Sequence, residues 1–305
     1  MTNKKYSKNT IGFLIAFAGA VLFSTKAIIA KEAYAGIAVA PITLIALRML
    51  FSLPFYAGVA LYSGKKEKTK LTAKQWWQII FVGLMGYYIS SLLDFAGLQY
   101  VSAGLERLIL FLYPTFAILI NAFVFKEKIT GLQKIALLIT YAGIGFAYVG
   151  ELNVDTSNPH FLLGSLLIFI CAITYSIYIV GSGRLVKQIG AAKFTAYAML
   201  VSTVGVLAHF IISGGLQQIH FSTQLAWFGF QLAIIATVIP SFMISYGMKI
   251  IGTNNTAIIT SVGPVATIIQ AHYVLGEKIY TTQIIGTALV IFGILIIGWK
   301  KNSEN

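Results

Sequence analysis

The sequence predicts an all-α membrane protein of ten transmembrane helices, arranged as two inverted five-helix repeats. Of the 305 residues, 58% are hydrophobic and only 10% are charged, whereas a soluble domain carries roughly a quarter charged residues. The mean hydropathy is +0.83. Too few polar side chains are present to cover a water-facing surface, so lipid is the expected solvent.

The apolar residues occur in continuous runs, which is typical of membrane helices rather than of alternating barrel strands. A helix needs about 20 such residues to cross the hydrocarbon core. Polar turns separate the runs, for example Ser63-Gly64-Lys65-Lys66, Asn153 to Pro159 and Ser213-Gly214-Gly215. The expected spans are 11–31, 37–62, 76–97, 101–124, 131–149, 161–185, 192–213, 223–247, 251–274 and 280–299.

The N-terminal end resembles the start of a signal peptide, because Lys4, Lys5 and Lys8 precede an apolar run that begins at Ile11. That run continues to about Ala30, and nine further runs follow it. We therefore expect an uncleaved first transmembrane helix.

The formal net charge is +13, and a basic balance can indicate nucleic-acid binding. Here the charges lie in short loops between apolar runs, so membrane topology explains them and no nucleic-acid partner is expected. With a cytoplasmic N-terminus, all but five of the 22 Lys and Arg residues fall in cytoplasmic segments. The exceptions are Lys26, Lys31, Arg48, Arg107 and Lys278. The positive-inside rule then predicts an inner-membrane protein with both termini in the cytoplasm.

An internal repeat appears when the chain is shifted by 150 residues without a gap. Apolar matches are uninformative in such a chain, but matches of Pro, Trp, Gln and Glu-Lys at one constant offset are specific. The pairs include Trp77/Trp227, Pro114/Pro264, Glu127-Lys128-Ile129/Glu277-Lys278-Ile279 and Gln133/Gln283. The sequence therefore divides into repeats 1–150 and 151–305.

Each repeat is expected to hold five spans, and an odd number reverses the second repeat relative to the first in the membrane. Glu127 then falls on the cytoplasmic side and Glu277 on the outer side. Inverted repeats are typical of secondary transporters, because the two halves can exchange conformations and expose a central site to either side. A duplication that is kept for packing alone is the alternative.

The fourth expected span and its repeat carry motifs that resemble the drug/metabolite transporter superfamily, EamA type. The resemblance covers essentially the whole chain. Its motifs are Ser102-Ala103-Gly104-Leu105-Glu106-Arg107, Tyr113-Pro114-Thr115 and Phe125-Lys126-Glu127-Lys128, echoed by Thr253-Asn254-Asn255-Thr256-Ala257, Val262-Gly263-Pro264 and Leu275-Gly276-Glu277-Lys278.

This resemblance implies ten spans in two five-helix repeats, and alternating access around a central cavity lined by helices 1, 3, 4, 6, 8 and 9. It also implies a small-molecule substrate such as an amino acid, a related metabolite, a cation or a drug, often exported. The Glu106-Arg107 pair is typical of some members only and marks a subgroup.

Ionisable groups inside a membrane are costly unless they are paired or hydrated, so each is a candidate for the transport site. Lys26, Asp94, Glu106 and Arg107 are expected near one face of the membrane and can form one charge cluster. That cluster is either a gate that makes and breaks ion pairs or a static interfacial network. Asp94 or Glu106 is a candidate carrier of a coupling proton.

Arg48 lies about 17 Å into the second expected span, near mid-depth. One reading is a cation that meets a substrate carboxylate in a water-filled cavity. The other, which we favour because helix 2 is peripheral to the family's cavity, is a structural arginine that ties helix 2 to a neighbour.

Aromatic residues fall on helices that are expected to face the cavity. They suit either a pocket for a flat or cationic solute or contact with lipid. His272 is more typical of an interfacial hydrogen-bonding residue than of a ligand. The candidates from these groups are Tyr113, Tyr175, Tyr246 and His272.

Pro114 and Pro264 occupy equivalent positions, expected in the middle of their helices. Proline removes a backbone hydrogen bond and kinks a helix. We interpret the pair as hinges that bend helices 4 and 9 in alternation.

No metalloprotease, nucleophile-elbow or nucleotide-binding motif occurs, and no catalytic residue, metal or cofactor is expected. A membrane-embedded enzyme and a non-transporting assembly or sensor protein remain the alternatives to a secondary transporter. The longest loop, about ten residues, leaves little room for a signalling domain.

Overall fold

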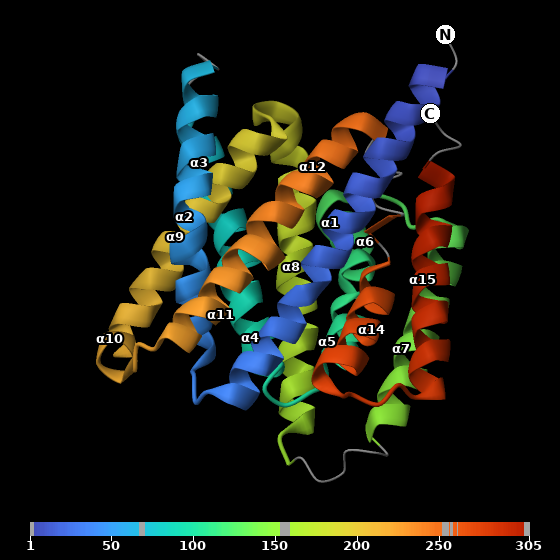
Figure 1. The fold of residues 1–305 in the computed structure, drawn as a ribbon. Coiled ribbons are helices and arrows are strands. Elements are labelled where there is room, and N and C mark those ends of the chain that lie inside the picture. Colours follow the sequence, from blue (N-terminus) through green and yellow to red (C-terminus); the bar gives the residue numbers. More distant parts are fainter. Residues whose placement is uncertain are drawn as a thin grey trace.

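The computed structural model describes residues 3–66, 71–152, 159–251, 256, 259–260 and 262–301. All regular secondary structure in these residues is helical, which confirms the predicted all-α fold. Figure 1 shows the helices as one bundle, in which α1 begins and α15 ends at the same end of the molecule.

The first half of the chain holds eight helical segments, one of which is a π-helix. They are α1 (Asn3–Gly36), α2 (Pro41–Lys66), α3 (Ala73–Gly83), π-helix η1 (Leu84–Ile89), α4 (Ser90–Gly97), α5 (Ala103–Leu110), α6 (Tyr113–Phe125) and α7 (Gly131–Leu152).

In the described residues, the second half follows a similar order, again with one π-helix, and adds the short α10. Its elements are α8 (Phe161–Ile189), α9 (Ala191–Ile212), the short α10 (Gly215–Gln218), α11 (Thr223–Ala233), π-helix η2 (Ile234–Val238), α12 (Ile239–Ile251), α14 (Gly263–Leu275) and α15 (Thr281–Lys301).

Eight helical stretches in the described residues are long and apolar enough to cross a membrane, so the chain is a multi-pass membrane protein. They are Thr10–Gly36, Pro41–Ser63, Ala73–Gly97, Ala103–Phe125, Gly131–Val149, Phe161–Val186, Ala191–Ile212 and Thr223–Ile244. The expected ninth span, 251–274, includes residues 252–255, 257–258 and 261, which lie outside the described part, as do residues 153–158 of one expected turn. The tenth coincides with α15, whose apolar stretch is Thr281–Gly293.

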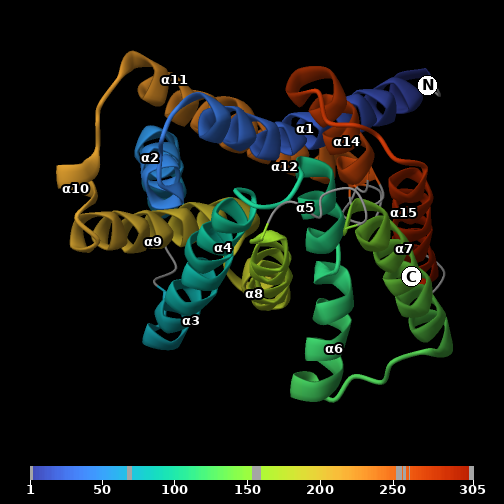
Figure 2. The ribbon, with the colours of Figure 1, turned by 90° about the horizontal axis from the view of Figure 1, so that it is seen from below.

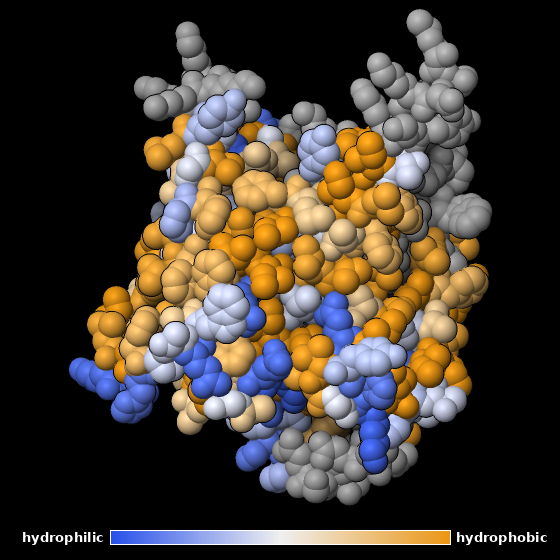
Figure 3. Space-filling view, in the orientation of Figure 1, coloured by the Kyte–Doolittle hydropathy of each residue, from blue (hydrophilic) through white to orange (hydrophobic). Residues whose placement is uncertain are grey.

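Large apolar side chains cover the outside of the bundle. Phe123 is 80% exposed, Val204 70% and Ile212 85%, which would be unfavourable in water and suits contact with lipid. Figure 3 shows apolar residues over most of the visible face, with hydrophilic residues gathered toward its lower end.

The boundaries of the elements recur at the offset of 150 that the sequence shows. Matching starts include α2 with α9, α3 with α11, α6 with α14, α7 with α15, and η1 with η2. Thr72 and Ser222 are N-caps at equivalent positions, and each side chain accepts a hydrogen bond from the backbone N–H three residues later. The repeat therefore extends to capping and to the two π-helices.

Contacts between the halves also occur in equivalent pairs. Helix α2 packs against its counterpart α9, and α7 packs against its counterpart α15, as Figure 2 shows. The packing of α1 on α12 has its equivalent in the packing of α8 on α4, and that of α1 on α14 in that of α8 on α6. Each half therefore contacts the other through equivalent helices.

A buried charge network as the candidate functional site

The fourth span is broken into two helices just before Pro114. Helix α5 begins after Ser102, whose hydroxyl accepts from the N–H of Leu105, and α6 begins at Tyr113 with Pro114 in its first turn. Pro264 has the equivalent place in α14. Both prolines were expected in mid-helix, but they lie at helix starts, because a proline lacks the N–H that helix interiors need and is tolerated in a first turn.

Three charged side chains from different helices meet in the interior. Lys26 of α1 forms an ion pair with Asp94 of α4, and the Lys26 Nζ lies 3.9 Å from the Glu106 Oε1 of α5. The residues are 8%, 2% and 0% exposed, respectively. The two carboxyl groups also adjoin each other. Lys26 therefore links the first, third and fourth spans.

Arg107 follows Glu106 on α5 and extends the charged group toward the second half. Its Nε donates to the Thr267 Oγ1 of α14 at 3.1 Å, and its guanidinium lies 5.8 Å from the ring centroid of Phe23 on α1. The structure thus brings together all four residues that the sequence proposed as a cluster. We call Lys26, Asp94, Glu106 and Arg107 the charge network.

Side-chain hydrogen bonds to backbone carbonyls join α1 to α14 and to the loop before α5, next to this network. The Ser24 hydroxyl donates to the Gly263 carbonyl at 3.2 Å, and the Gln270 amide donates to the Val21 carbonyl at 3.1 Å. Lys31 donates to the Val101 carbonyl at 2.8 Å. These bonds hold the first span between two segments that are far apart in the sequence.

The loop after α14 lies against the start of α5. A carboxylate oxygen of Glu277 accepts the backbone N–H of Ala103 at 3.0 Å, where an anion is favoured by the helix dipole. His272, which is exposed, has its Nδ1 2.9 Å from the Glu277 carbonyl oxygen. Sequence reasoning missed this role of Glu277. The repeated Glu-Lys pair, Glu127-Lys128 and Glu277-Lys278, marked both loops as related. It did not indicate that Glu277, rather than Glu127, accepts a helix N–H.

Arg48 lies apart from the ion pairs of the network. The structured helix begins at Pro41, so Arg48 is about 10 Å along α2 rather than 17 Å. Its Nη2 donates to the Ser91 Oγ of α4 at 2.8 Å, and its guanidinium lies 5.3 Å from the ring centroid of Phe95. It connects α2 to α4.

Four tyrosines form a contiguous group between α6, α8 and η1. The rings of Tyr113 and Tyr175 meet edge to face at 5.1 Å, and Tyr175 stacks on Tyr178 at 5.7 Å. The hydroxyls of Tyr178 and Tyr87 are 2.8 Å apart. Tyr113 and Tyr175 from the sequence prediction therefore share one aromatic cluster.

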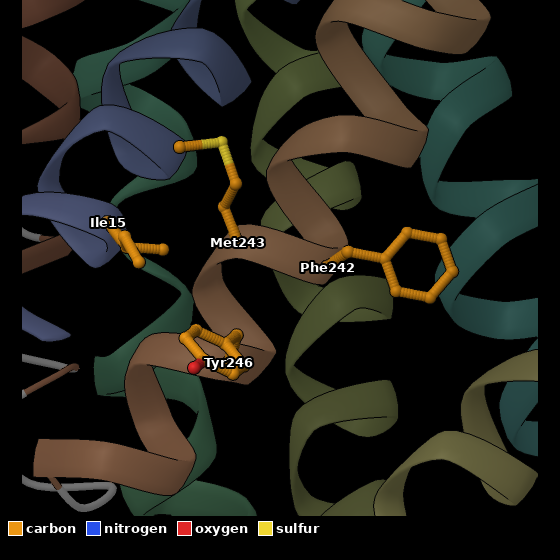
Figure 4. Close-up of a pocket in the computed structure, with 4 residues that line it drawn as sticks. All are labelled: Ile15, Phe242, Met243 and Tyr246. Atoms are coloured by element: carbon orange, nitrogen blue, oxygen red, sulfur yellow. The ribbon is translucent and has the colours of Figure 1, made fainter.

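Tyr246 does not belong to that cluster. It is 54% exposed and lines an open, apolar depression on the surface with Ile15, Phe242 and Met243. Figure 4 shows these side chains at the contact of α1 and α12. An open apolar depression on a membrane helix pair suits lipid, and it offers almost no polar group to hold a solute.

Eight apolar spans and a charge network buried among them define a multi-pass membrane protein whose interior carries paired ionisable groups. The EamA-like transporter family matches residues 10–149 and 162–299. The chain belongs to that family, which confirms the resemblance seen in the sequence and makes the protein a membrane transporter.

Relatives of the chain carry transporter names. It is 28% identical over 302 residues to the uncharacterized transporter YcbK of Bacillus subtilis, a match that covers 97% of this chain and 96% of the relative. A WAT1-related protein of Arabidopsis thaliana is 23% identical, with 87% and 82% covered. One solved crystal structure shares the fold with a TM-score of 0.65 at 18% identity, covering 94% of this chain and 96% of that one.

Proposed function

We propose that this chain is a secondary transporter in the inner membrane that moves a small metabolite, such as an amino acid or a related compound, by alternating access. The observation that carries the proposal is the equivalence of the two halves. Element boundaries recur at one offset, and contacts between the halves come in exchanged pairs. Two halves that can each adopt the other's conformation are what alternating access requires.

In this proposal the repeats 1–150 and 151–305 are inverted, each with five spans, and both termini are cytoplasmic. Accessibility of cysteines introduced at Ser63 and Gln218 to a membrane-impermeant thiol reagent tests the topology in Cys171→Ser protein. Labelling of Gln218→Cys from outside and of Ser63→Cys only after permeabilisation is expected. Labelling of both from the same side contradicts the inverted arrangement.

The charge network is proposed to act as the gate. Lys26 bridges two carboxylates from α4 and α5, so separation of α1 from these helices must break ion pairs. Re-forming those pairs closes the path again. Asp94 and Glu106 are the proposed carriers of a coupling proton, because protonation of either carboxyl removes its attraction to Lys26.

Flux into proteoliposomes tests transport and coupling together. A panel of radiolabelled amino acids and related metabolites is measured with and without an imposed pH gradient, for the parent protein and for Asp94→Asn and Glu106→Gln. We expect gradient-driven flux that at least one of these variants loses, with Arg184→Gln as the exposed-charge control. Flux that is indifferent to the gradient excludes both residues as proton carriers, and a protein that neither binds nor moves any solute contradicts transport.

Pro114 and Pro264 are the proposed hinges. Each starts a helix after a break in its span, so bending there disturbs few backbone hydrogen bonds. Transport is measured for Pro114→Ala and Pro264→Ala at matched expression. We expect slower transport in both, and unchanged rates in both variants exclude the hinge role.

A further inference from the structure

Arg48 is a buried cation whose charge is not neutralised by a direct partner. The residue is 5% exposed, and in the described part of the chain no carboxylate lies within 4.0 Å of it. Asp94 attracts it from farther away but is already paired with Lys26. Its direct partners are the hydroxyl of Ser91 and the ring of Phe95. A charged group inside a membrane is costly with so few partners.

Ser52 provides a second polar group without a partner on the same helix. It lies four residues after Arg48, so the two side chains occupy one face of α2. The Ser52 Oγ and the Arg48 Nε are both buried, and neither has a hydrogen-bond partner among the described residues. Buried polar groups in proteins are nearly always paired, so two of them on one helix face need an explanation.

The second half of the chain shows that the fold does not require this arrangement. At the offset of 150, the residues equivalent to Arg48 and Ser52 are Ala198 and Ser202 on α9. Ala198 is fully buried, and the Ser202 hydroxyl donates to backbone carbonyls, including that of Gly83 at 2.7 Å. The same packing position is therefore filled by a small apolar residue in one half and by arginine in the other.

We propose that Arg48 and Ser52 form an intramembrane binding site for a carboxylate or another small oxyanion. The guanidinium supplies its free Nε–H donor and the positive charge, and the Ser52 hydroxyl supplies a second donor one turn away. Arginine matches the planar, two-oxygen geometry of a carboxylate, which a lysine cannot match. An anion at this place would neutralise Arg48 and satisfy both orphaned groups.

Thermal unfolding of the purified full chain in detergent, titrated with sodium acetate, sodium chloride or sodium phosphate, tests the site. We expect acetate to raise the melting temperature saturably in the parent protein and in Arg184→Ala, which removes an exposed arginine. Arg48→Ala, which copies the second half, should lose the saturable part. Ser52→Ala should need about tenfold more acetate for half-saturation, because a hydrogen bond to a charged group is lost.

The comparison of anions identifies the source of the ligand. A saturable response to acetate and not to phosphate or chloride supports a site for the carboxylate of an organic solute, and a response to both acetate and phosphate supports a site for small oxyanions in general. A response to chloride as strong as that to acetate overturns the proposal, because a halide lacks the two-oxygen geometry that the site is proposed to recognise. Equal saturable stabilisation in the parent and Arg48→Ala overturns the proposal, as does the absence of a saturable response to any of the three anions in the parent. If Arg48→Ala does not fold, Arg48→Lys and Ser52→Ala take its place. The proposal is overturned if both reach half-saturation at the same acetate concentration as the parent protein. No flux is measured, so the outcome is independent of the proposed transport.

Discussion

The loops after α6 and after α14 share a Glu-Lys-Ile sequence and a backbone course, but the glutamate carboxylates of the two loops make different contacts. In each, the N–H of the glutamate donates to a carbonyl six residues earlier, Glu127 to Asn121 at 3.2 Å and Glu277 to Ala271 at 3.1 Å. Glu277 reaches across to the N-terminus of α5. Glu127 has a side chain that is 60% exposed and lies 3.6 Å from Arg184.

This difference shows that the two halves share element boundaries in the described residues but differ in the contacts that their side chains make. The end of the molecule with Glu277 also holds the charge network, since α5 carries both the Ala103 N–H and Glu106. The Glu127 end has an exposed ion pair instead. Such a pair contributes little to stability, whereas buried charges lose much when a partner is removed.

The largest expected effect is at the buried end. Lys26→Met leaves two buried carboxylates without their shared cation, so we expect the free energy of unfolding to fall by about 3–5 kcal/mol. Denaturant unfolding of the purified protein in detergent measures this loss. Arg184→Met at the other end is the matched control and should cost about 1 kcal/mol or less. Equal losses in the two variants would refute the contrast.

Removal of the carboxylate from each loop should destabilise the protein by different amounts. Glu277→Ala breaks a hydrogen bond to a charged group at a helix N-terminus, for an expected loss of about 1.5–3 kcal/mol. Glu127→Ala should be nearly neutral. Hydrogen exchange of the peptide that contains Ala103 should become faster only in Glu277→Ala. Faster exchange there in Glu127→Ala as well would show that the contact is not local.

The two equivalent helix caps should respond alike to substitution, unlike the two loop carboxylates. Thr72 and Ser222 cap α3 and α11 at matching positions, so Thr72→Ala and Ser222→Ala should each cost about 1 kcal/mol. Unfolding midpoints under identical conditions test the match. A several-fold difference between the two would mean that the scaffold itself, and not just the loop contacts, is asymmetric.

The smallest single effect is expected for Lys126→Gly, at the residue before Glu127, whose counterpart before Glu277 is Gly276. Lys126 has φ 58° and Gly276 has φ 69°, in the left-handed region that glycine adopts without strain. Lys126→Gly should therefore be tolerated or stabilise by a few tenths of a kcal/mol, and Gly276→Ala should destabilise by about 1 kcal/mol. A destabilised Lys126→Gly protein would indicate that the lysine side chain makes a contact worth more than the strain.

Hydropathy predicted the helical class and most span boundaries, because lipid burial alone fixes where apolar runs begin and end. The charge network could also be anticipated, since ionisable residues are rare in such runs. The tyrosine group could be named only in part, and Tyr246 lies apart from it. When every face of a helix is apolar, no hydrophobic stripe tells which side points inward.

Contacts between loops and helix ends could not be predicted from the sequence, for a different reason. The Glu277 bond to Ala103 joins residues 174 positions apart and depends on how α14 and α15 place their loop. The sequence predicted kinks within continuous helices at Pro114 and Pro264, whereas each proline lies in the first turn of a helix, the place where its missing N–H costs no hydrogen bond.

The π-helices η1 and η2 have a consequence for how their spans meet neighbours. A π turn holds more residues than an α turn, so an inserted residue shifts the helix phase by about 100°. Helix α3 packs on α9 and α8, and α4, beyond η1, packs on α8 and α2. The third span thus keeps α8 as a neighbour along its length and exchanges α9 for α2, and its counterpart keeps α1 as a neighbour through α11, η2 and α12. Removing one residue from η1 would realign α3 with α4 and rotate Asp94 away from Lys26, turning a local change in winding into a change of ion pairing.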